Sequence, residues 1–159
     1  MRSTDGELFA DIYPGLVRFA AAVRPAGIEP EDLVQEALAR TLTIRALSEL
    51  DEPATYLRTA MIRIASNLQR GRRRSIGRIE RLDHRSETVD SYPSELADLV
   101  QLAPRARAIL FLTVIEGEQY RTAAAIVGCS ESAARTIASR ALHDLRAHVS
   151  AEIDAKEAP

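Results

Sequence analysis

The sequence predicts an all-α protein made of two small helical domains joined by a flexible linker. Apolar residues recur at the three- and four-residue spacing of amphipathic helices through most of the chain, and no useful strand-like alternation occurs. The length of 159 residues suits one ordinary domain or two small ones, and 46% hydrophobic residues can fill their cores. A stretch rich in charge, serine, glycine and proline separates two periodic regions and predicts the linker.

The first domain, residues 1–74, is expected to hold three helices. The first spans residues 5–23, and Pro14 inside it predicts a kink or a break. The second has Glu29 as its cap and Pro30 at its first position, and is expected to run to about Leu47. The third begins near Pro53. The expected inward residues are Leu8, Ile12, Leu16 and Phe19, then Leu33, Ala37, Leu38, Thr41 and Leu42, then Leu57, Ala60, Met61, Ile64, Ala65 and Leu68.

Residues 75–93 are interpreted as a tether with at most a partial helix. The second domain, residues 94–150, is expected to begin with a short helix at about 94–102. A helix then starts at Pro104, continues to about Glu116 and is closed by Gly117. The remaining residues, 151–159, should fray.

Residues 119–142, QYRTAAAIVGCSESAARTIASRAL, predict two short helices joined by a tight turn. Gly128 can adopt the positive φ at which a helix ends, and Ser130 is a suitable N-cap for the next helix. Such a helix-turn-helix lies with one helix in a DNA groove and its back on a core. The open alternative is an alanine-rich hairpin in a helical bundle or repeat array. The apolar sides are expected to hold Ala123, Ala124 and Ile126 or Val127 in the first helix, and Ala134, Ile137, Ala138, Ala141 and Leu142 in the second.

Charge is strongly separated along the chain, although the net charge is only −2. Residues 1–57 hold ten acidic residues against five arginines, whereas residues 58–85 hold nine arginines against Glu80 and Asp83. The basic block can neutralise DNA phosphates through counterion release, and the acidic part can face a protein partner. The alternative is a solvated arginine-rich tail without function.

Several classes of protein have no support in the sequence. No apolar run is long enough to span a membrane and no secretory signal is present, so a cytoplasmic protein without membrane insertion is expected. Cys129 is better interpreted as a small core residue than as a redox sensor, and it forms no ligand cluster with the dispersed histidines His84, His143 and His148. We therefore expect no metal, no cofactor and no catalytic residue; an enzyme would need a nucleophile with its base, a metal set or a phosphate-binding glycine loop.

Four motifs in order resemble the extracytoplasmic-function group of bacterial RNA polymerase sigma factors. These are LFADIYPGLVRF at residues 8–19, PEDLVQEAL at 30–38, ATYLRTAMIRIASNLQRGRRR at 54–74, and LAPRARAILFLTVIEGEQYRTAAAIVGCS at 102–130. The resemblance spans about residues 7–147. It implies a protein that binds core RNA polymerase and promoter DNA, directs transcription initiation, and has an anti-sigma factor as a further candidate partner.

The resemblance also implies which residues form each surface. In the family, a polar stripe of the second helix docks onto a coiled coil of the largest polymerase subunit, while a capping and solvating role is the structural alternative for this acidic turn. The third helix holds the non-template strand of the minus-10 element, and the helix-turn-helix reads the minus-35 element. The implied residues are Asp32, Leu33, Gln35 and Glu36 for core polymerase; Tyr56, Arg58, Arg63, Asn67, Arg70, Arg72, Arg73 and Arg74 for minus-10 DNA; and Ser132, Arg135, Thr136, Ser139 and Arg140 for minus-35 DNA.

Two departures from the family pattern keep alternatives open. Tyr56 stands where many relatives have tryptophan, and Ile137 replaces a basic residue after the turn. One alternative is a sigma-like protein that occupies polymerase or an inhibitor but binds DNA poorly. Another is an ordinary helix-turn-helix regulator, which would need neither the PEDLVQE motif nor the separate basic helix.

Overall fold

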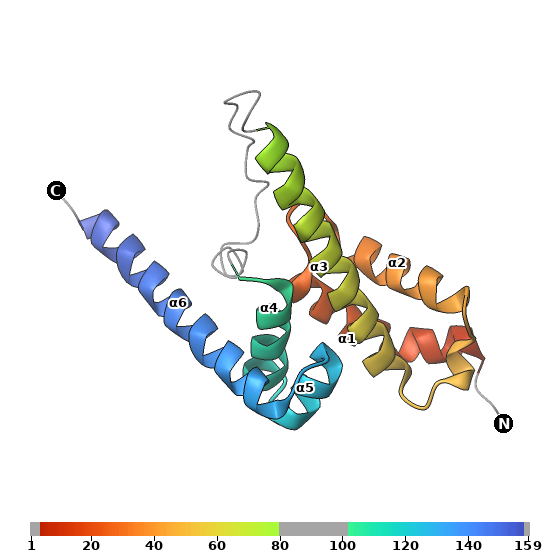
Figure 1. The fold of residues 1–159 in the computed structure, drawn as a ribbon. Coiled ribbons are helices and arrows are strands. Elements are labelled where there is room, and N and C mark those ends of the chain that lie inside the picture. The colour runs from red at the N-terminus through yellow and green to blue at the C-terminus, as the bar shows by residue number, and fades with distance from the viewer. Residues whose placement is uncertain (1–3, 80–101, 158–159) are drawn as a thin grey trace. The chain divides into compact units, whose positions relative to one another are not determined.

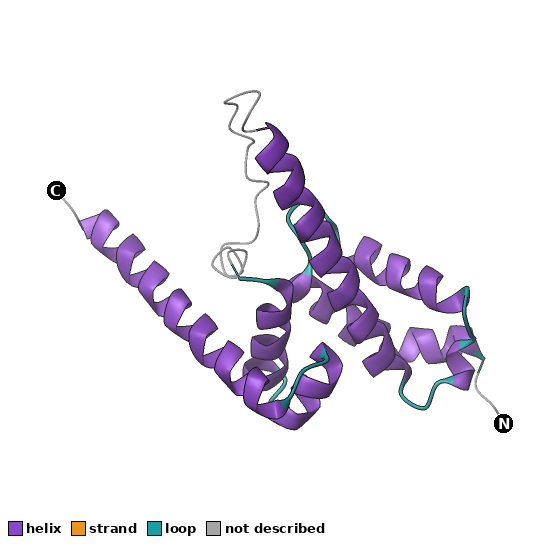
Figure 2. Cartoon of the chain, viewed as in Figure 1, coloured by secondary structure: helices purple, strands orange, loops and turns teal. Residues whose placement is uncertain are grey.

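The computed structural model describes residues 4–79 and 102–157, and the chain divides into two compact units, Met1–Asp90 and Ser91–Pro159 (Figure 1). Every regular element in the two described ranges is helical (Figure 2), which confirms the all-α prediction. The short helix expected at residues 94–102 lies, except for Leu102, outside the described residues, as does most of the expected linker.

Helix α1, Asp5–Val23, begins with a capping box. The Glu7 backbone N–H donates to Thr4 Oγ1 at 3.3 Å, and the Thr4 backbone N–H donates to Glu7 Oε2 at 2.9 Å. These two bonds satisfy backbone donors that a helix N-terminus otherwise leaves open. The helix continues through Pro14, so the break that the sequence predicted there is absent.

Helix α2, Pro30–Leu42, ends before the predicted limit at Leu47. The backbone N–H groups of Ile44 and Arg45 both donate to the Thr41 carbonyl, and a separate 3-10 turn, η1 (Leu47–Glu49), follows. Glu29 occupies the N-cap position but makes no side-chain cap bond.

Helix α3, Pro53–Ile79, packs against both α1 and α2 and completes the core of the first unit. It extends beyond Arg74, so residues 75–79 form a helical part of the segment that the sequence predicted as a tether with at most a partial helix. Leu42 and Leu68 are 48% and 42% exposed, which corrects the expectation that they face inward. The buried apolar residues of this unit are Leu16, Phe19, Ala20, Ala22, Val23, Leu33, Val34, Ala37, Leu47, Leu57, Met61, Ile62, Ile64 and Ala65.

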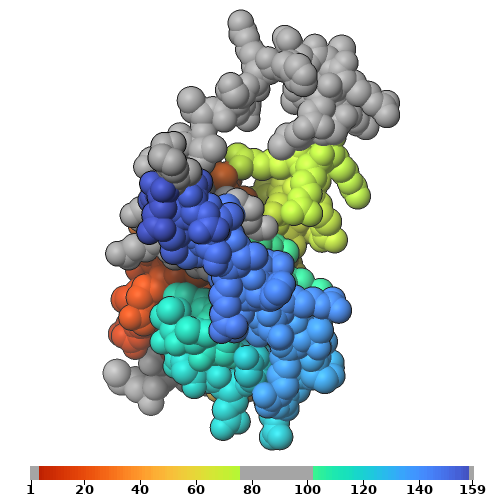
Figure 3. Space-filling model, turned by 90° about the vertical axis from the view of Figure 1, so that its left-hand side faces the viewer, coloured from red at the N-terminus to blue at the C-terminus, as the bar shows by residue number. Residues whose placement is uncertain are grey.

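The second unit starts with α4, Pro104–Leu110, which passes into a π-helical turn, η3 (Phe111–Ile115). Helices α5, Tyr120–Val127, and α6, Glu131–Glu157, follow. Gly117 precedes α5 with a φ of 70°. Helix α6 continues to Glu157, so the described part of residues 151–159, which the sequence predicted to fray, is helical. The atoms of α6 lie at the surface along its length (Figure 3).

The turn between α5 and α6 is as the sequence predicted, but α6, with 27 residues, is much longer than the short second helix expected. Gly128 has a φ of 79° at the end of α5, and the Ala133 backbone N–H donates to Ser130 Oγ at 3.1 Å. Alanines at 134, 138 and 141 are buried, which allows α6 to approach its neighbours closely. All four candidate core positions of α5 are buried: Ala123, Ala124, Ile126 and Val127. Ile137 and Leu142 are only half-buried.

Candidate nucleic-acid interface

One face of α3 carries a polar stripe made of Tyr56, Arg63, Asn67, Arg70 and Arg74, here called the α3 stripe. An α-helix turns by about 100° per residue, so the sequence separations within this set bring the five side chains to one side. Tyr56 is half-buried and the other four are exposed. Arg70 Nη2 donates to Asn67 Oδ1 at 2.6 Å. The stripe combines one aromatic ring with three guanidinium groups along a helix.

Three other arginines of the predicted minus-10 set lie off this stripe. The Arg58 guanidinium carbon is 5.2 Å from the ring centroid of Phe19, a fully buried residue of α1. Arg72 Nη2 approaches Gly27, a residue with a φ of 77°, so closely that a Cβ there would be only 2.9 Å away. Arg58 therefore contacts α1, and Arg72 contacts the loop after α1. Arg73 is exposed and lies between the α3 stripe and the side of α3 that carries Arg58 and Arg72.

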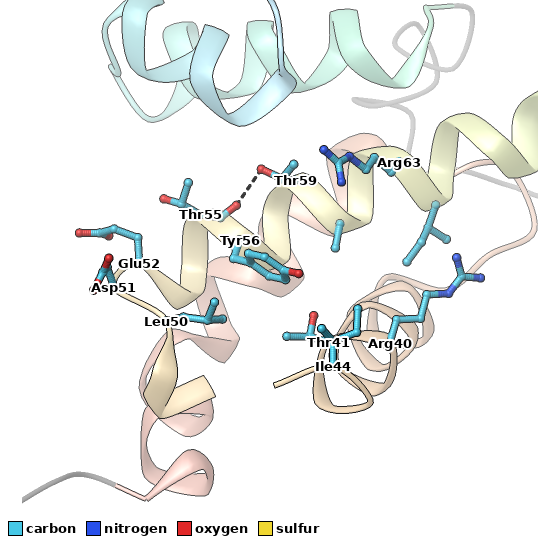
Figure 4. Close-up of a pocket in the computed structure, with 12 residues that line it drawn as sticks. Arg40, Thr41, Ile44, Leu50, Asp51, Glu52, Thr55, Tyr56, Thr59 and Arg63 are labelled. Atoms are coloured by element: carbon cyan, nitrogen blue, oxygen red, sulfur yellow. Dashed lines mark hydrogen bonds between the residues drawn. The ribbon is translucent and has the colours of Figure 1, made fainter. Parts of the chain in front are cut away.

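A pocket of about 530 Å³ opens beside Tyr56, between the end of α2, the following loop and the first turns of α3 (Figure 4). Tyr56 projects from α3 toward Thr41 and Ile44. The lining residues are Arg40, Thr41, Ile44, Leu50, Asp51, Glu52, Thr55, Tyr56, Thr59, Ala60, Arg63 and Ile64. The pocket thus places apolar walls next to groups of both charges. Sequence reasoning missed its loop residues, because no periodic pattern says where a loop folds back.

Asp5 anchors the loop that borders this pocket. Its carboxylate oxygens accept hydrogen bonds from the backbone N–H groups of Leu47 at 3.1 Å and Ser48 at 2.9 Å. The bonds from Ser48, backbone first and then side chain, lower the pKa of Asp5 below its ordinary value of 3.8. The start of α1 therefore fixes residues 47–48, just before the pocket wall.

The predicted polymerase-binding residues of α2 divide into two groups. Asp32, Gln35 and Glu36 are exposed, whereas Leu33 is 1% exposed and belongs to the core. Glu36 Oε1 accepts from Arg40 Nε at 2.6 Å, one turn further along the helix. Only the three polar residues are therefore available to a partner.

The outer face of α6 brings together Ser132, Arg135, Thr136 and Ser139, with Arg140 at its edge. All five are exposed. Thr136 Oγ1 donates to the Ser132 carbonyl at 3.0 Å, one turn back along the same face. We call these five residues the α6 face.

Arg135 lies in a cluster that spans the turn between α5 and α6. Its Nη2 is 2.8 Å from Glu131 Oε1, and its guanidinium carbon is 4.6 Å from the ring centroid of Tyr120. Arg121 Nε lies 3.8 Å from the other oxygen of Glu131. The spacing of Glu131 and Arg135 by four residues is visible in the sequence, whereas the contact with Tyr120 depends on the fold. Sequence reasoning missed Tyr120, Arg121 and Glu131.

Within residues 4–79 and 102–157, no group of three or more histidine, cysteine, aspartate or glutamate side chains could hold a metal ion. Over the same ranges, no helix is both long and apolar enough to cross a membrane. Cys129 has a free thiol and is half-buried.

Family models match the chain in two places. A model described as Sigma-70 region 2 matches residues 8–75, and one described as Sigma-70, region 4 matches residues 99–145. The chain belongs to the sigma-70 family. The presence of the two regions in this order confirms the prediction of a sigma factor. A sigma factor binds core RNA polymerase and directs initiation at promoter DNA, so the predicted role in transcription is also confirmed.

Two solved structures resemble this sigma factor in fold. The sigma factor RpoE of Bartonella quintana, solved with the anti-sigma factor NepR, aligns with a TM-score of 0.67 and 21% identity, covering 91% of this chain and 96% of that chain. The PhyRSL–NepR complex of Sphingomonas sp. Fr1 aligns with a TM-score of 0.56 and 20% identity, covering 91% and 88%. We found no significant match among curated proteins.

Proposed function

We propose that this sigma factor reads promoters with two surfaces, the α3 stripe for the single-stranded minus-10 element and the α6 face for the minus-35 duplex. The observation that carries the proposal is the α3 stripe itself: Tyr56 and the arginines at 63, 70 and 74 share one side of a helix, beside a pocket. Single-stranded DNA is held by aromatic rings that stack on bases and by cations along the backbone. A solvated basic tail would need no such alignment.

The pocket beside Tyr56 supports a role in strand opening. A base that leaves the duplex stack needs an apolar wall and polar groups for its edge. Ile44 and Leu50 supply apolar surface, while Thr41, Asp51 and Arg63 supply acceptors or donors. We propose that Tyr56 provides the ring on which an opened minus-10 base stacks, in the position where many relatives use tryptophan. Arg58 and Arg72 contribute to the fold of the first unit in this proposal.

The α6 face supports duplex reading. Arginine can donate two hydrogen bonds to guanine in the major groove, and serine and threonine hydroxyls can bond to bases or phosphates. Arg135 and Arg140 differ in position on the helix, so we assign them different contacts. Ile137 is half-buried and faces away from DNA in this proposal.

The exposed residues of α2 are proposed to bind core polymerase. Asp32, Gln35 and Glu36 form a polar surface, and Leu33 supports it from the core. The proposed partner is the coiled coil of the largest polymerase subunit. Because Leu33 is buried, it would act indirectly, unlike the three exposed residues of this surface.

The remaining assignments follow from the family and the neighbours. We propose domain limits of 1–74 and 94–150, a cytoplasmic location and no catalytic activity of the sigma factor itself. Because both similar solved structures contain NepR, we propose that an anti-sigma protein binds this chain as well.

Promoter opening tests the proposed role of Tyr56. Holoenzyme made with the Tyr56→Ala variant should bind closed promoter duplex like the parent but open it more slowly, because stacking is available only after a base leaves the duplex. Opening can be followed with 2-aminopurine in the minus-10 element. Tyr56→Phe is the matched control and should open DNA nearly as fast as the parent. Equal opening rates for all three proteins would refute the role.

A further inference from the structure

The contacts of Arg135 carry an inference about residues that do not themselves face DNA. We propose that Tyr120 and Glu131 are positioning residues that hold the Arg135 guanidinium in the orientation in which it reads a base of the minus-35 element. This inference rests on the proposed role of the α6 face. It adds that two residues outside that face help to determine which base pair Arg135 prefers.

The two contacts leave most of the Arg135 guanidinium available. The Arg135 guanidinium carbon lies over the Tyr120 ring, 4.6 Å from its centroid, and Glu131 Oε1 accepts from Nη2 at 2.8 Å. A guanidinium has five N–H donors in a planar fork. The cation–π contact with Tyr120 is not a conventional hydrogen bond, and the bond to Glu131 uses one donor. The other donors remain free to make paired hydrogen bonds to a guanine edge.

The cluster also determines which direction the fork points. Arg135 is exposed over 60% of its side chain, so without these contacts it would sample many rotamers. Tyr120 comes from α5, whereas Glu131 lies one turn before Arg135 on α6. Contacts from both helices restrict the side chain more than one contact within α6 would. An arginine already oriented before binding loses less conformational freedom when it meets its base.

Glu131 has a second effect that separates it from an ordinary structural residue. It is a negative charge in the first turn of the helix that would meet DNA, and it lies near Arg121 and Arg135 together. Replacing it with glutamine removes repulsion from phosphates and also weakens the contact with Arg135, because a neutral amide oxygen accepts more weakly than a carboxylate. Glu131→Gln is therefore expected to raise affinity for random-sequence duplex while it weakens sequence preference.

The test measures sequence preference with the full-length sigma factor in holoenzyme. The probe is a pool of promoter duplexes randomised across the minus-35 element, and bound sequences are counted. Arg135→Ala first identifies the base pair whose preference depends on Arg135. Tyr120→Leu should then reduce discrimination at that base pair by about two- to fivefold, the range for a cation–π contact at an exposed site, and leave other positions unchanged.

The following comparisons decide whether Tyr120 and Glu131 position Arg135. Tyr120→Phe keeps the ring and should retain the parent preference, whereas a structural role for the hydroxyl would make it behave like Tyr120→Leu. In an Arg135→Ala background, Tyr120→Leu should have no further effect on the Arg135-dependent base pair. An additive effect there, or an unchanged preference in Tyr120→Leu and Glu131→Gln, would overturn the inference.

Failure of the α6 face to read the minus-35 element would give a different pattern of base preferences from failure of the positioning role. If Arg135→Ala itself left every base preference unchanged, the assignment of the α6 face would fail and the inference with it. If Arg135→Ala changed the preference while the Tyr120 and Glu131 variants did not, only the positioning role would fail. Thermal unfolding of each variant identifies a change caused by loss of folding, and Glu131→Gln remains informative if Tyr120→Leu does not fold.

Discussion

The salt dependence of DNA binding is the most quantitative consequence of the α3 stripe. The change is the triple substitution Arg63→Gln, Arg70→Gln and Arg74→Gln. All three side chains are exposed on one side of α3, and the apolar face of the helix is elsewhere. Folding should therefore hardly change, while three candidate phosphate contacts are removed together.

The size of the effect follows from counterion release. Each phosphate neutralised by a cation contributes about 0.7 for single strands and about 0.9 for duplex to the slope of log affinity against log salt. Loss of three contacts should make the slope shallower by roughly 2 to 3 units. At a fixed salt concentration the affinity should also fall, most strongly when salt is low.

The assay is holoenzyme binding to a promoter fragment with an open minus-10 region, measured over a series of salt concentrations. The matched control carries Arg18→Gln, Arg146→Gln and Lys156→Gln, which change the net charge equally at exposed positions off the stripe. The control should keep the parent slope. An unchanged slope in the stripe variant, or equal changes in both triple variants, would show that the arginines of the α3 stripe do not contact DNA phosphates specifically.

Three further predictions concern other parts of the molecule. Asp32→Ala with Gln35→Ala should weaken capture by core polymerase without changing thermal stability, because both side chains are exposed; unchanged capture would contradict the α2 surface. Gly128→Ala should cost about 1–2 kcal/mol of folding free energy, because alanine disfavours the φ of 79° at this position. No atom lies within 4 Å of the new Cβ, so the cost would come from the backbone conformation alone. Gly6→Ala, in α1, is the control and should cost nothing. Asp5→Asn should lower thermal stability at neutral pH. A carboxyl whose folded pKa is lowered stabilises the fold above its ordinary pKa of 3.8 and loses this effect as pH falls through the folded value, so the parent and variant should converge in acid.

Helix positions were readable from the sequence wherever the signals were local. Pro30 and Pro104 stand at helix starts, and Gly117 and Gly128 stand at ends, because the fixed φ of proline and the positive φ of glycine depend on the residue itself. The phase of each apolar stripe was also correct. Of the kink or break predicted at Pro14, the break is absent, since one missing backbone donor did not interrupt the helix.

The extent of the core was harder to predict than its phase. Leu68 continues the apolar stripe of α3 but is 42% exposed, whereas Val34 and Ile62, which were not predicted, are buried. Periodicity shows which side of a helix faces its partner but not where that partner ends. The same limit applied to the arginines: Arg58 and Arg72 contact α1 and the loop after it, and only the structure distinguishes them from the arginines of the α3 stripe.

Reconstituted transcription on a promoter library tests whether this sigma factor reads promoters with two separate surfaces, the α3 stripe and the α6 face. Core polymerase with this sigma factor should initiate from templates enriched in two separate sequence blocks. Tyr56→Ala should weaken selection of the minus-10 block alone, and Arg135→Ala should weaken selection of the minus-35 block alone. The proposal of two separate promoter-reading surfaces would be contradicted if the sigma factor failed to stimulate initiation, or if either substitution altered selection of both blocks equally.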